Sequence, residues 1–311
     1  MRKATLLALG TVLLGFGGPA AAQTPSAEEV QEIVVTARRA GIPVWTVTSP
    51  TTTVILVGAI ENVSKDTRWN ANNLTDALRK ADRVMFPQEQ DYKASPFAMI
   101  GFAFRILRTQ KLPKGKSLMQ MMSPGQFAEL TALQKRGVLS PGFERRNPLH
   151  LSMELQLVAE GKTGLGTDAY EYTRKAIKKH KIRMVPLPKL KLNKSVNAVL
   201  NAPPQAHVPC LLASARMVAA GPDTLRQRSL AWSERRVADA LASPAETAFE
   251  ACAMNEYLER SPDWRATMRR VLNEPQLTVA VLNLASLAQP GGLLDELSSA
   301  GFDVRGPRWK R

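Results

Sequence analysis

The run Val54–Val57, followed directly by Gly58, constrains the fold more than any other stretch of this chain. Three of its four apolar residues are β-branched, and a short continuous apolar run of this kind is typical of a strand buried on both faces. Gly58 allows the backbone to turn tightly or to approach a ligand where the strand ends. Because ligands of α/β sheets bind at the carboxyl ends of strands, a functional site is expected at residues 58–62.

The remaining pattern alternates strands with helices. Residues 44–48 alternate as a strand should and, through a turn at Pro50, predict a β-hairpin with the central run. Further strands are expected over 83–86, 182–187, 278–284 and 302–304. Helices are expected over 74–81, 95–108, 124–137, 148–161, 169–179 and 291–300, and over most of 197–274. This order predicts an α/β (α+β) fold, with a mixed central β-sheet flanked by helices.

The N-terminus has the three parts of a secretory signal peptide. Arg2 and Lys3 form a short positive region, residues 4–15 form an apolar region, and Ala20–Ala22 form a small-residue cleavage site. The apolar region is shorter than a membrane span requires, and no transmembrane anchor is expected after cleavage. We therefore expect an exported, periplasmic protein that begins at Gln23.

Residues 23–42 are expected to form a flexible N-terminal segment before the domain. Residues 32–39 are rich in β-prone side chains, and they resemble the TonB box of outer-membrane transporters, which binds by adding a strand to the sheet of its partner. The alternatives are a linker or the first edge strand of the domain. The chain is thus divided into a signal peptide (1–22), this segment (23–42) and one domain (43–311).

Cys210 and Cys252 are the two cysteines of the chain. An even cysteine count in an oxidising compartment indicates a disulfide. The alternative is a pair of buried free thiols. Their spacing is unlike the paired Cys-x-x-Cys pattern of metal sites.

The stretch from Gly58 to Glu61 resembles the opening motif of the TraB/PrgY/GumN family, which includes the Tiki-type metalloproteases, and the resemblance extends from Pro43 to the C-terminus. The resemblance implies a divalent metal held by three groups. These are the histidine of a Gly-x-x-His after this strand, a glutamate after the next strand, and a second Gly-x-x-His late in the chain. Two imidazoles and a carboxylate suit a metal that keeps one position open for water.

This chain departs from that pattern at all three positions. Glu61 replaces the first histidine, and Pro87 stands where the glutamate is expected, with Glu89 two residues on. The late motif aligns with residues 282–285, Leu-Asn-Leu-Ala, so that its glycine and histidine are both absent. The resemblance therefore implies the fold, whereas the inherited metal site is lost, and we expect neither a metal nor another cofactor.

Six residues are candidates for lining a cleft near these strand ends. The candidate cleft residues are Gly58, Glu61, Asn62, Glu89, Asp168 and Asn283. Three of them, Glu61, Glu89 and Asp168, offer carboxylates for a hard cation or for acid–base work. Nothing in the sequence shows that these carboxylates converge.

The formal net charge of +15 favours anionic partners. Basic residues gather around one predicted helix and the residues after it: Arg174, Lys175, Lys178, Lys179, Lys181 and Arg183. Aromatic residues do not interleave with them, which argues against single-stranded nucleic acid as the partner. Export also makes an anionic component of the cell envelope the better expectation, and the alternative is a solvated basic surface.

These observations lead to one expected function and two alternatives. The chain is expected to be an exported pseudoenzyme of the TraB/GumN type that binds an anionic envelope ligand or partner. The first alternative is a metal-dependent hydrolase with a rearranged carboxylate site at Glu61, Glu89 and Asp168. The second is a TonB-linked envelope component that uses residues 32–39.

Overall fold

A computed structural model describes residues 26–86, 109–187, 192–252 and 262–310. Its centre is a five-stranded sheet with the strand order β3-β4-β2-β1-β5. The strands are β1 (Val44–Thr48), β2 (Thr53–Ala59), β3 (Arg83–Met85), β4 (Thr278–Asn283) and β5 (Asp303–Arg305). β4 lies parallel to both β2 and β3, while β1 is antiparallel to β2 and β5. The sheet is therefore mixed, as predicted, and β1 and β2 form the predicted hairpin.

Burial explains why β2 and β4 occupy the middle of the sheet. All six residues of β4 are buried, as are residues 54–59 of β2. Two parallel strands with apolar side chains on both faces need cover on both sides. Because β5 and β2 are both antiparallel to β1, they run in one direction, and the carboxyl ends of β2, β3, β4 and β5 share one edge of the sheet.

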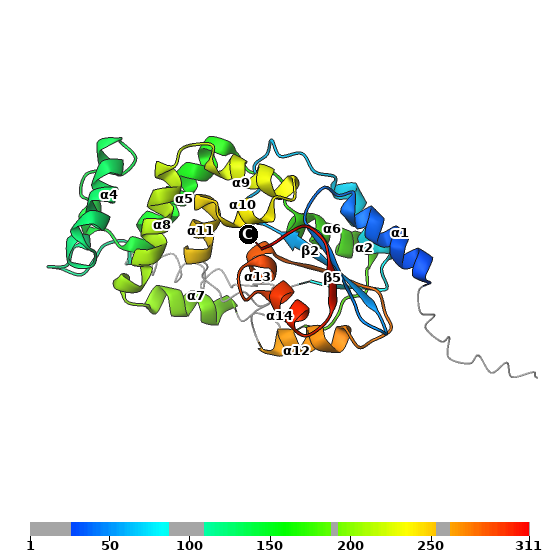
Figure 1. Ribbon diagram of the computed structural model, residues 1–311. Coiled ribbons are helices and arrows are strands. Elements are labelled where there is room, and N and C mark those ends of the chain that lie inside the picture. Colours follow the sequence, from blue (N-terminus) through cyan, green and yellow to red (C-terminus); the bar gives the residue numbers. More distant parts are fainter. Residues whose placement is uncertain (1–25, 87–108, 188–191, 253–261, 311) are drawn as a thin grey trace, which may run out of the picture.

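Helices cover the two faces of the sheet (Figure 1). One side carries α1 (Ala27–Arg38), α2 (Ala71–Lys80) and α6 (Ala169–His180). The other carries α12 (Pro262–Val271), α13 (Leu284–Ala288) and α14 (Leu293–Ser299). This arrangement bears out the flanked α/β architecture that the sequence predicts.

The other helices extend from the carboxyl edge of the sheet (Figure 1). They are α4 (Pro124–Lys135), α5 (Pro148–Thr163), α7 (Leu192–Asn201), α8 (Val208–Ala219), α9 (Thr224–Ser233), α10 (Val237–Leu241) and α11 (Pro244–Cys252). Short 3₁₀ turns span Leu118–Gln120, Phe143–Arg145 and Pro204–His207. Several of these helices enclose a second apolar core that includes Leu130, Leu155 and Leu211. Of these helices, α9 and α10 lie nearest the sheet, between it and the second core.

Helix starts follow the capping residues of the sequence. Ser123 caps α4 by accepting a hydrogen bond from the backbone N–H of Gln126, and proline follows it at the first helical position. Asn147 caps α5 in the same way, again with a proline after it. The side chain thus binds a backbone N–H that the helix itself leaves without a partner. Gly164 ends α5, three residues beyond the predicted end.

The expected strand at 182–187 is reduced to one bridge. Val84 pairs with Met184, and its N–H and C=O bind Arg183 and Val185. β3 has only three residues, so that little edge remains for pairing. Pro186 follows at once, and it has no backbone N–H to donate to a ladder. The strand prediction is therefore wrong beyond this bridge.

The alternative interpretation of residues 32–39 as the first edge strand of the domain is wrong, because residues 27–38 form α1. Ser26 and Glu29 close a capping box at its start. Ile33, Val34 and Ala37 share one helical face and are buried in the main core. Packing of this face outweighs the β propensity of the isoleucine and valines. The segment is a packed helix rather than a flexible or strand-forming one, so it cannot add a strand to a TonB-like partner without unfolding.

The predicted disulfide is confirmed. Cys210 on α8 and Cys252 on α11 are bonded, with their Cα atoms 4.6 Å apart. The predicted signal peptide, Glu89 and the helix expected over 95–108 lie outside the described residues. Among the residues that are described, no helix has the length and apolar character needed to cross a membrane.

Candidate functional site

The two glycine-motif positions of the sequence lie side by side on neighbouring strands. Gly58 on β2 pairs with Leu282 on β4, and Ala59 pairs with Asn283. Glu61 lies three positions after Gly58 and Ala285 three positions after Leu282, just beyond the ends of these parallel strands. Met85 on β3 pairs with Ala280, two residues before Leu282. The two described positions, Glu61 and Ala285, therefore follow strand ends at one edge of the sheet, and β3 ends at the same edge, while residue 87 lies outside the described part of the chain.

Side chains fill the space beside Gly58. A Cβ atom added to Gly58 would lie 2.7 Å from Cδ1 of Leu284 and 3.0 Å from Cζ3 of Trp45. Both distances are shorter than ordinary van der Waals contacts, so that only glycine fits between these two side chains. Its role here is close packing rather than approach of a ligand.

Helix α9 covers the end of β2. The indole Nε1 of Trp232 donates a hydrogen bond of 2.8 Å to the carbonyl oxygen of Gly58. Arg228 Nη1 donates one of 2.7 Å to the carbonyl oxygen of Glu61. Arg228 also forms an ion pair of 2.5 Å with Glu246, and both side chains are almost completely buried. These contacts bind the backbone oxygens at the strand end and place a guanidinium there.

The two candidate cleft residues that follow β2, Glu61 and Asn62, have surface and packing roles. Glu61 is exposed. Asn62 has a left-handed backbone, with φ of 52°, and its side-chain amide donates a hydrogen bond of 3.1 Å to the carboxylate of Glu160 on α5. Burial raises the pKa of Glu160.

The candidate residues Asp168 and Asn283 are helix caps. Asp168 accepts a hydrogen bond of 2.9 Å from the backbone N–H of Glu171 at the start of α6. Its pKa is raised, mainly by burial, against the lowering effect of that bond. Asn283 is buried and accepts a hydrogen bond of 3.0 Å from the backbone N–H of Ser286 at the start of α13. Both side chains use the cap position typical of Asn and Asp.

The described residues do not fit the metal that the resemblance implies. At the two inherited positions that the structure describes, Glu61 offers one carboxylate and the buried Ala285 offers no donor. The guanidinium of Arg228 adds a positive charge at the same strand end. Within the described ranges, no three or more His, Cys, Asp and Glu side chains are grouped to hold a metal ion.

The predicted basic patch lies on α6 and the residues that follow it. All six of its side chains are exposed: Arg174, Lys175, Lys178, Lys179, Lys181 and Arg183. Lys175 pairs with Glu171 at 2.5 Å, one helical turn away. Exposed ion pairs of this kind contribute little to stability, because water screens the attraction between the two charges. Binding of a partner at this patch stays a prediction.

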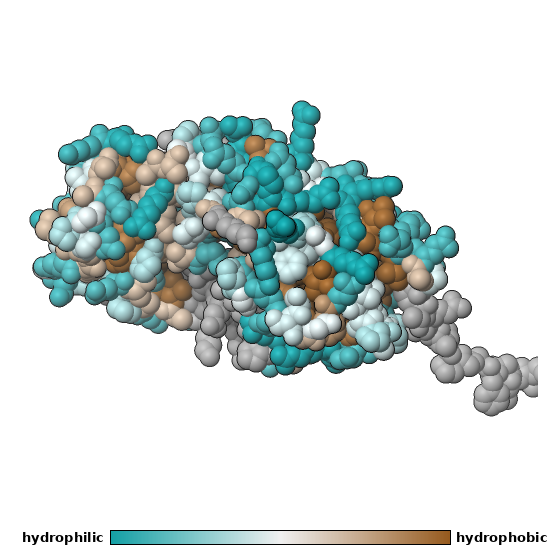
Figure 2. All heavy atoms as spheres, viewed as in Figure 1, coloured by the Kyte–Doolittle hydropathy of each residue, from teal (hydrophilic) through white to brown (hydrophobic). Residues whose placement is uncertain are grey.

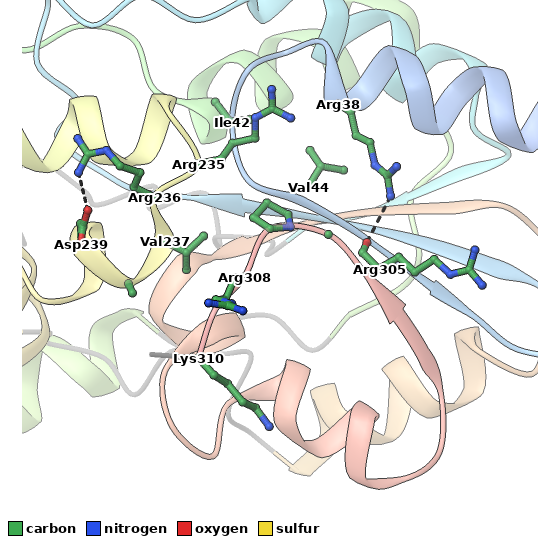
Figure 3. A pocket seen from close by; sticks show the side chains of 13 residues that line it. Arg38, Ile42, Val44, Arg235, Arg236, Val237, Asp239, Arg305, Arg308 and Lys310 are labelled. Atoms are coloured by element: carbon green, nitrogen blue, oxygen red, sulfur yellow. Dashed lines mark hydrogen bonds and ion pairs between the residues drawn. The ribbon is translucent and has the colours of Figure 1, made fainter.

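A second basic surface, which the sequence did not reveal, is concave. It is a hollow of about 740 Å³, called here the arginine hollow (Figure 3). Its charged lining consists of Arg38, Arg235, Arg236, Arg305, Arg308, Lys310 and a single acid, Asp239. The sequence signal is two short basic runs about 70 positions apart, at 235–236 and 305–310, with Arg38 far from both. Only the fold brings them together.

The arginine hollow lies at the carboxyl edge of the sheet. Its wall includes Val44, which pairs with Val57 near the end of β2. It also includes Gly306 and Pro307, which directly follow β5. The carbonyl oxygen of Pro307 accepts a hydrogen bond of 2.9 Å from Trp45, the side chain that also packs on Gly58. The hollow thus lies beside the altered motif, displaced toward the β1–β5 side of the sheet.

Most of the cations in the arginine hollow already have partners. Arg236 binds Glu234 at 2.8 Å and Asp239 at 2.6 Å. Arg305 pairs with Asp303 at 2.7 Å, and Lys310 pairs with Asp295 at 3.1 Å. Arg38 donates hydrogen bonds of 3.4 Å to Oγ1 of Thr46 and to the carbonyl oxygen of Arg305.

Two guanidinium groups remain available. The side chains of Arg235 and Arg308 have no ion pair or hydrogen bond within the described part of the chain. Figure 3 shows Arg308 in the middle of the hollow and Arg235 on the wall formed by the end of α9. Arg235 has a left-handed backbone, with φ of 60°. Residues other than glycine and asparagine seldom end a helix in this conformation.

Comparison with known proteins gives one match. The family model described as the TraB/PrgY/gumN family matches residues 43–306, nearly the whole chain. The match starts just before β1 and ends just after β5, so it spans the sheet and the basic patch on α6. Arg38, Arg308 and Lys310 of the arginine hollow lie outside the matched residues. No curated protein and no solved structure matches the chain.

Proposed function

The chain belongs to the TraB/PrgY/gumN family, and we propose that it is an exported member that has lost metal-dependent hydrolysis and acts by binding an anionic ligand or partner of the cell envelope. The family membership supplies the fold. The two parts of the proposal, loss of chemistry and gain of anion binding, rest on different residues and are tested separately.

The observation that carries the proposal is the arginine hollow. It joins Arg235 and Arg308, both without a partner in the described residues, in a concavity at the edge where α/β sheets bind ligands. A guanidinium presents a planar fork of N–H donors that suits carboxylate and phosphate groups. Clefts lined by one sign of charge also raise the local concentration of the opposite ion. An anion is therefore the ligand that this geometry favours.

The backbone of Arg235 supports a binding role independently of its charge. A non-glycine residue in the left-handed region costs roughly 1–2 kcal/mol. Glycine would meet the same requirement at the end of α9 without that cost. An arginine at this position supports the view that its side chain has a use beyond stability.

Loss of hydrolytic chemistry is supported by the residues at the end of β2. Leu284 and Trp45 close the space at Gly58, and Arg228 donates to the carbonyl oxygen of Glu61. A catalytic metal of the family type needs about three protein ligands and an open position. The basic patch on α6 offers a second docking surface for anions, in line with the net charge of +15.

The binding part is tested with two small anionic probes, methyl phosphate and glucuronate, by calorimetric titration of residues 23–311 at low salt. Arg308→Gln should weaken binding of at least one probe about tenfold or more. Arg235→Gly should weaken it as well, without lowering the free energy of unfolding. Arg226→Gln is the matched control, because Arg226 is an exposed arginine of α9 outside the hollow. Equal affinities in all four proteins, or no binding at all, contradict the proposal.

A further inference from the structure

We infer that the ligand of the arginine hollow is an amphiphile, with a phosphate or carboxylate head group and a single alkyl or acyl chain. The inference rests on the proposed function and adds the chemical class of the ligand. It is drawn from a second hollow that shares part of its wall with the first.

The second hollow is predominantly apolar and has a volume of about 530 Å³. It lies between the end of α10, the segment joining α13 to α14, and the C-terminal residues, and it is called here the apolar hollow. Its lining is Ala238, Leu241, Ala242, Ala288, Pro290, Asp295, Trp309 and Lys310. Both hollows have the size of small-molecule sites, which run from roughly 300 to 1,000 Å³.

The two hollows meet. Ala238 and Lys310 line both of them, so the hollows are adjacent, and we infer that one ligand extends from the first into the second. Residues 308–310 form the boundary, with Arg308 in the arginine hollow and Trp309 in the apolar hollow. A molecule that fills both therefore needs a negative group at one end and an apolar chain at the other.

The one acid of the apolar hollow is held by neighbouring donors. Asp295 accepts hydrogen bonds from Trp309 Nε1 at 2.9 Å and from the backbone N–H of Gly291 at 3.0 Å, and it pairs with Lys310. These donors, the Trp309 indole foremost, lower the pKa of Asp295, so that it stays ionised at neutral pH. Its charge is balanced by Lys310, and its role is to hold the Trp309 ring in the wall.

Charge decides which end of the ligand lies where. An anionic head group in the arginine hollow is attracted by a lining of six cations and one acid, whereas a cationic head group would be repelled by it. The chain then removes apolar surface of Leu241, Ala242 and Pro290 from water, which is favourable in proportion to the area covered. Figure 2 shows hydrophilic residues over most of this face and hydrophobic residues in small separate groups, so that an apolar hollow beside a basic one is a local feature.

The test compares dodecyl phosphate, methyl phosphate and dodecyltrimethylammonium by calorimetric titration below the concentrations at which micelles form. Laurate is a further arm that separates a carboxylate from a phosphate head group. Dodecyl phosphate or laurate should bind at least about tenfold more tightly than methyl phosphate, because the chain is buried. Dodecyltrimethylammonium should bind at least tenfold more weakly than dodecyl phosphate.

Variants separate the two hollows. Ala242→Trp fills the apolar hollow and should remove the advantage of the long chain while leaving methyl phosphate binding unchanged. Arg308→Gln should weaken binding of both phosphates, and Arg226→Gln should affect neither. Ligand-induced change in tryptophan fluorescence should disappear in Trp309→Phe while binding persists.

The possible failures are distinguishable. If methyl phosphate binds as tightly as dodecyl phosphate and both depend on Arg308, the amphiphile inference is overturned and the proposed anion site stands. If dodecyltrimethylammonium binds as well as dodecyl phosphate, the arginine hollow does not select the head group, and the inference is also overturned. If neither phosphate nor laurate binds, the inference and the proposed function at this hollow both fail.

Discussion

Gly58 and Leu282 are paired residues in the parallel ladder between β2 and β4. This pairing places the two glycine-motif positions of the chain next to each other at the carboxyl edge of the sheet. The first motif keeps Gly58 and has Glu61 in place of its histidine, the second has neither its glycine nor its histidine, and Leu284 and Trp45 fill the space beside Gly58. Loss of the motif is therefore one local event in the fold, although the residues involved are more than 200 positions apart in the sequence.

Gly58→Ala should destabilise the protein by about 1–3 kcal/mol, because the new methyl group overpacks the core. Its Cβ would lie 2.7 Å from Leu284 Cδ1. Urea unfolding of both proteins measures the difference in the free energy of unfolding. The second variant, Gly58→Ala with Leu284→Ala, should lose less than the sum of the two single changes, because the smaller side chain makes room.

Gly125→Ala is the control for that experiment. Gly125 lies in the first turn of α4 with no atom within 4 Å of an added Cβ. The substitution should therefore leave stability unchanged or raise it slightly, since alanine favours the helix. A loss at Gly58→Ala no larger than that at Gly125→Ala would mean that the space at the motif is open.

Arg228→Met should cost about 3–5 kcal/mol, because it leaves the buried Glu246 without its partner. Both side chains are almost fully buried, and Arg228 also donates to the Glu61 carbonyl oxygen. Arg228→Met combined with Glu246→Leu should be less destabilising than the single change, since neither charge is then buried alone. Arg226→Met, at an exposed position of the same helix, should change stability by less than about 0.5 kcal/mol. A fully additive double variant would contradict the pairing.

Replacing both Cys210 and Cys252 by alanine should lower stability by about 4 kcal/mol in the loop-entropy account of disulfides. The bond joins α8 to α11 across a sequence separation of 42. Dithiothreitol should destabilise the wild type by a similar amount and leave the double variant unaffected. Two free thiols titrated in the unfolded, unreduced protein would exclude the bond.

The parts of the fold that sequence predicts well are those with strong local signals. The apolar runs at 54–57 and 278–283 form the central parallel pair, and the caps at Ser123 and Asn147 begin helices as expected. Each of these signals lies within a few consecutive residues, and packing in the fold favours the same element. Local agreement of this kind is why such elements are predictable.

The parts that sequence predicts poorly depend on distant contacts. Residues 32–38 have β propensity, yet Ile33, Val34 and Ala37 bury one helical face against the core. The arginine hollow combines α1, the end of α9 and the segment after β5, which no local pattern links. By contrast, the sequence predicts a role in a cleft for Asp168 and Asn283, whereas in the structure both side chains cap helices.

Asp168→Asn should stabilise the protein at neutral pH and have no such effect near pH 3. Burial raises the folded-state pKa of Asp168 above its ordinary value of 3.8, so that the folded protein holds this proton to a higher pH than the unfolded chain does. The carboxylate therefore costs stability as pH rises through the window that begins near 3.8. Asparagine keeps the helix cap and does not ionise.

Unfolding curves of Asp168→Asn and wild type at several pH values between 3 and 7 measure this difference. The gain should appear as pH rises and become constant above the folded-state pKa. Asp66→Asn removes the same charge at an exposed position and is the control for the change in net charge. A gain at pH 3 equal to that at pH 7 would attribute the effect to the cap rather than to ionisation.

Glu61→His should not create a metal-dependent hydrolase. The substitution restores one imidazole, whereas Ala285 still offers no donor and Pro87 has no side-chain ligand. A catalytic zinc site needs about three protein ligands with one position left for water. The histidine would also lie where Arg228 binds the backbone oxygen of residue 61, and a nearby guanidinium opposes a divalent cation.

Mass spectrometry of the intact protein should find well below one equivalent of zinc, manganese or cobalt in both wild type and Glu61→His. A chelator should leave the unfolding temperatures of both proteins unchanged, since a structural ion would contribute to folding. Near-stoichiometric metal in the untagged wild type, together with peptide cleavage that a chelator abolishes, would replace the binding proposal with the rearranged site at Glu61, Glu89 and Asp168.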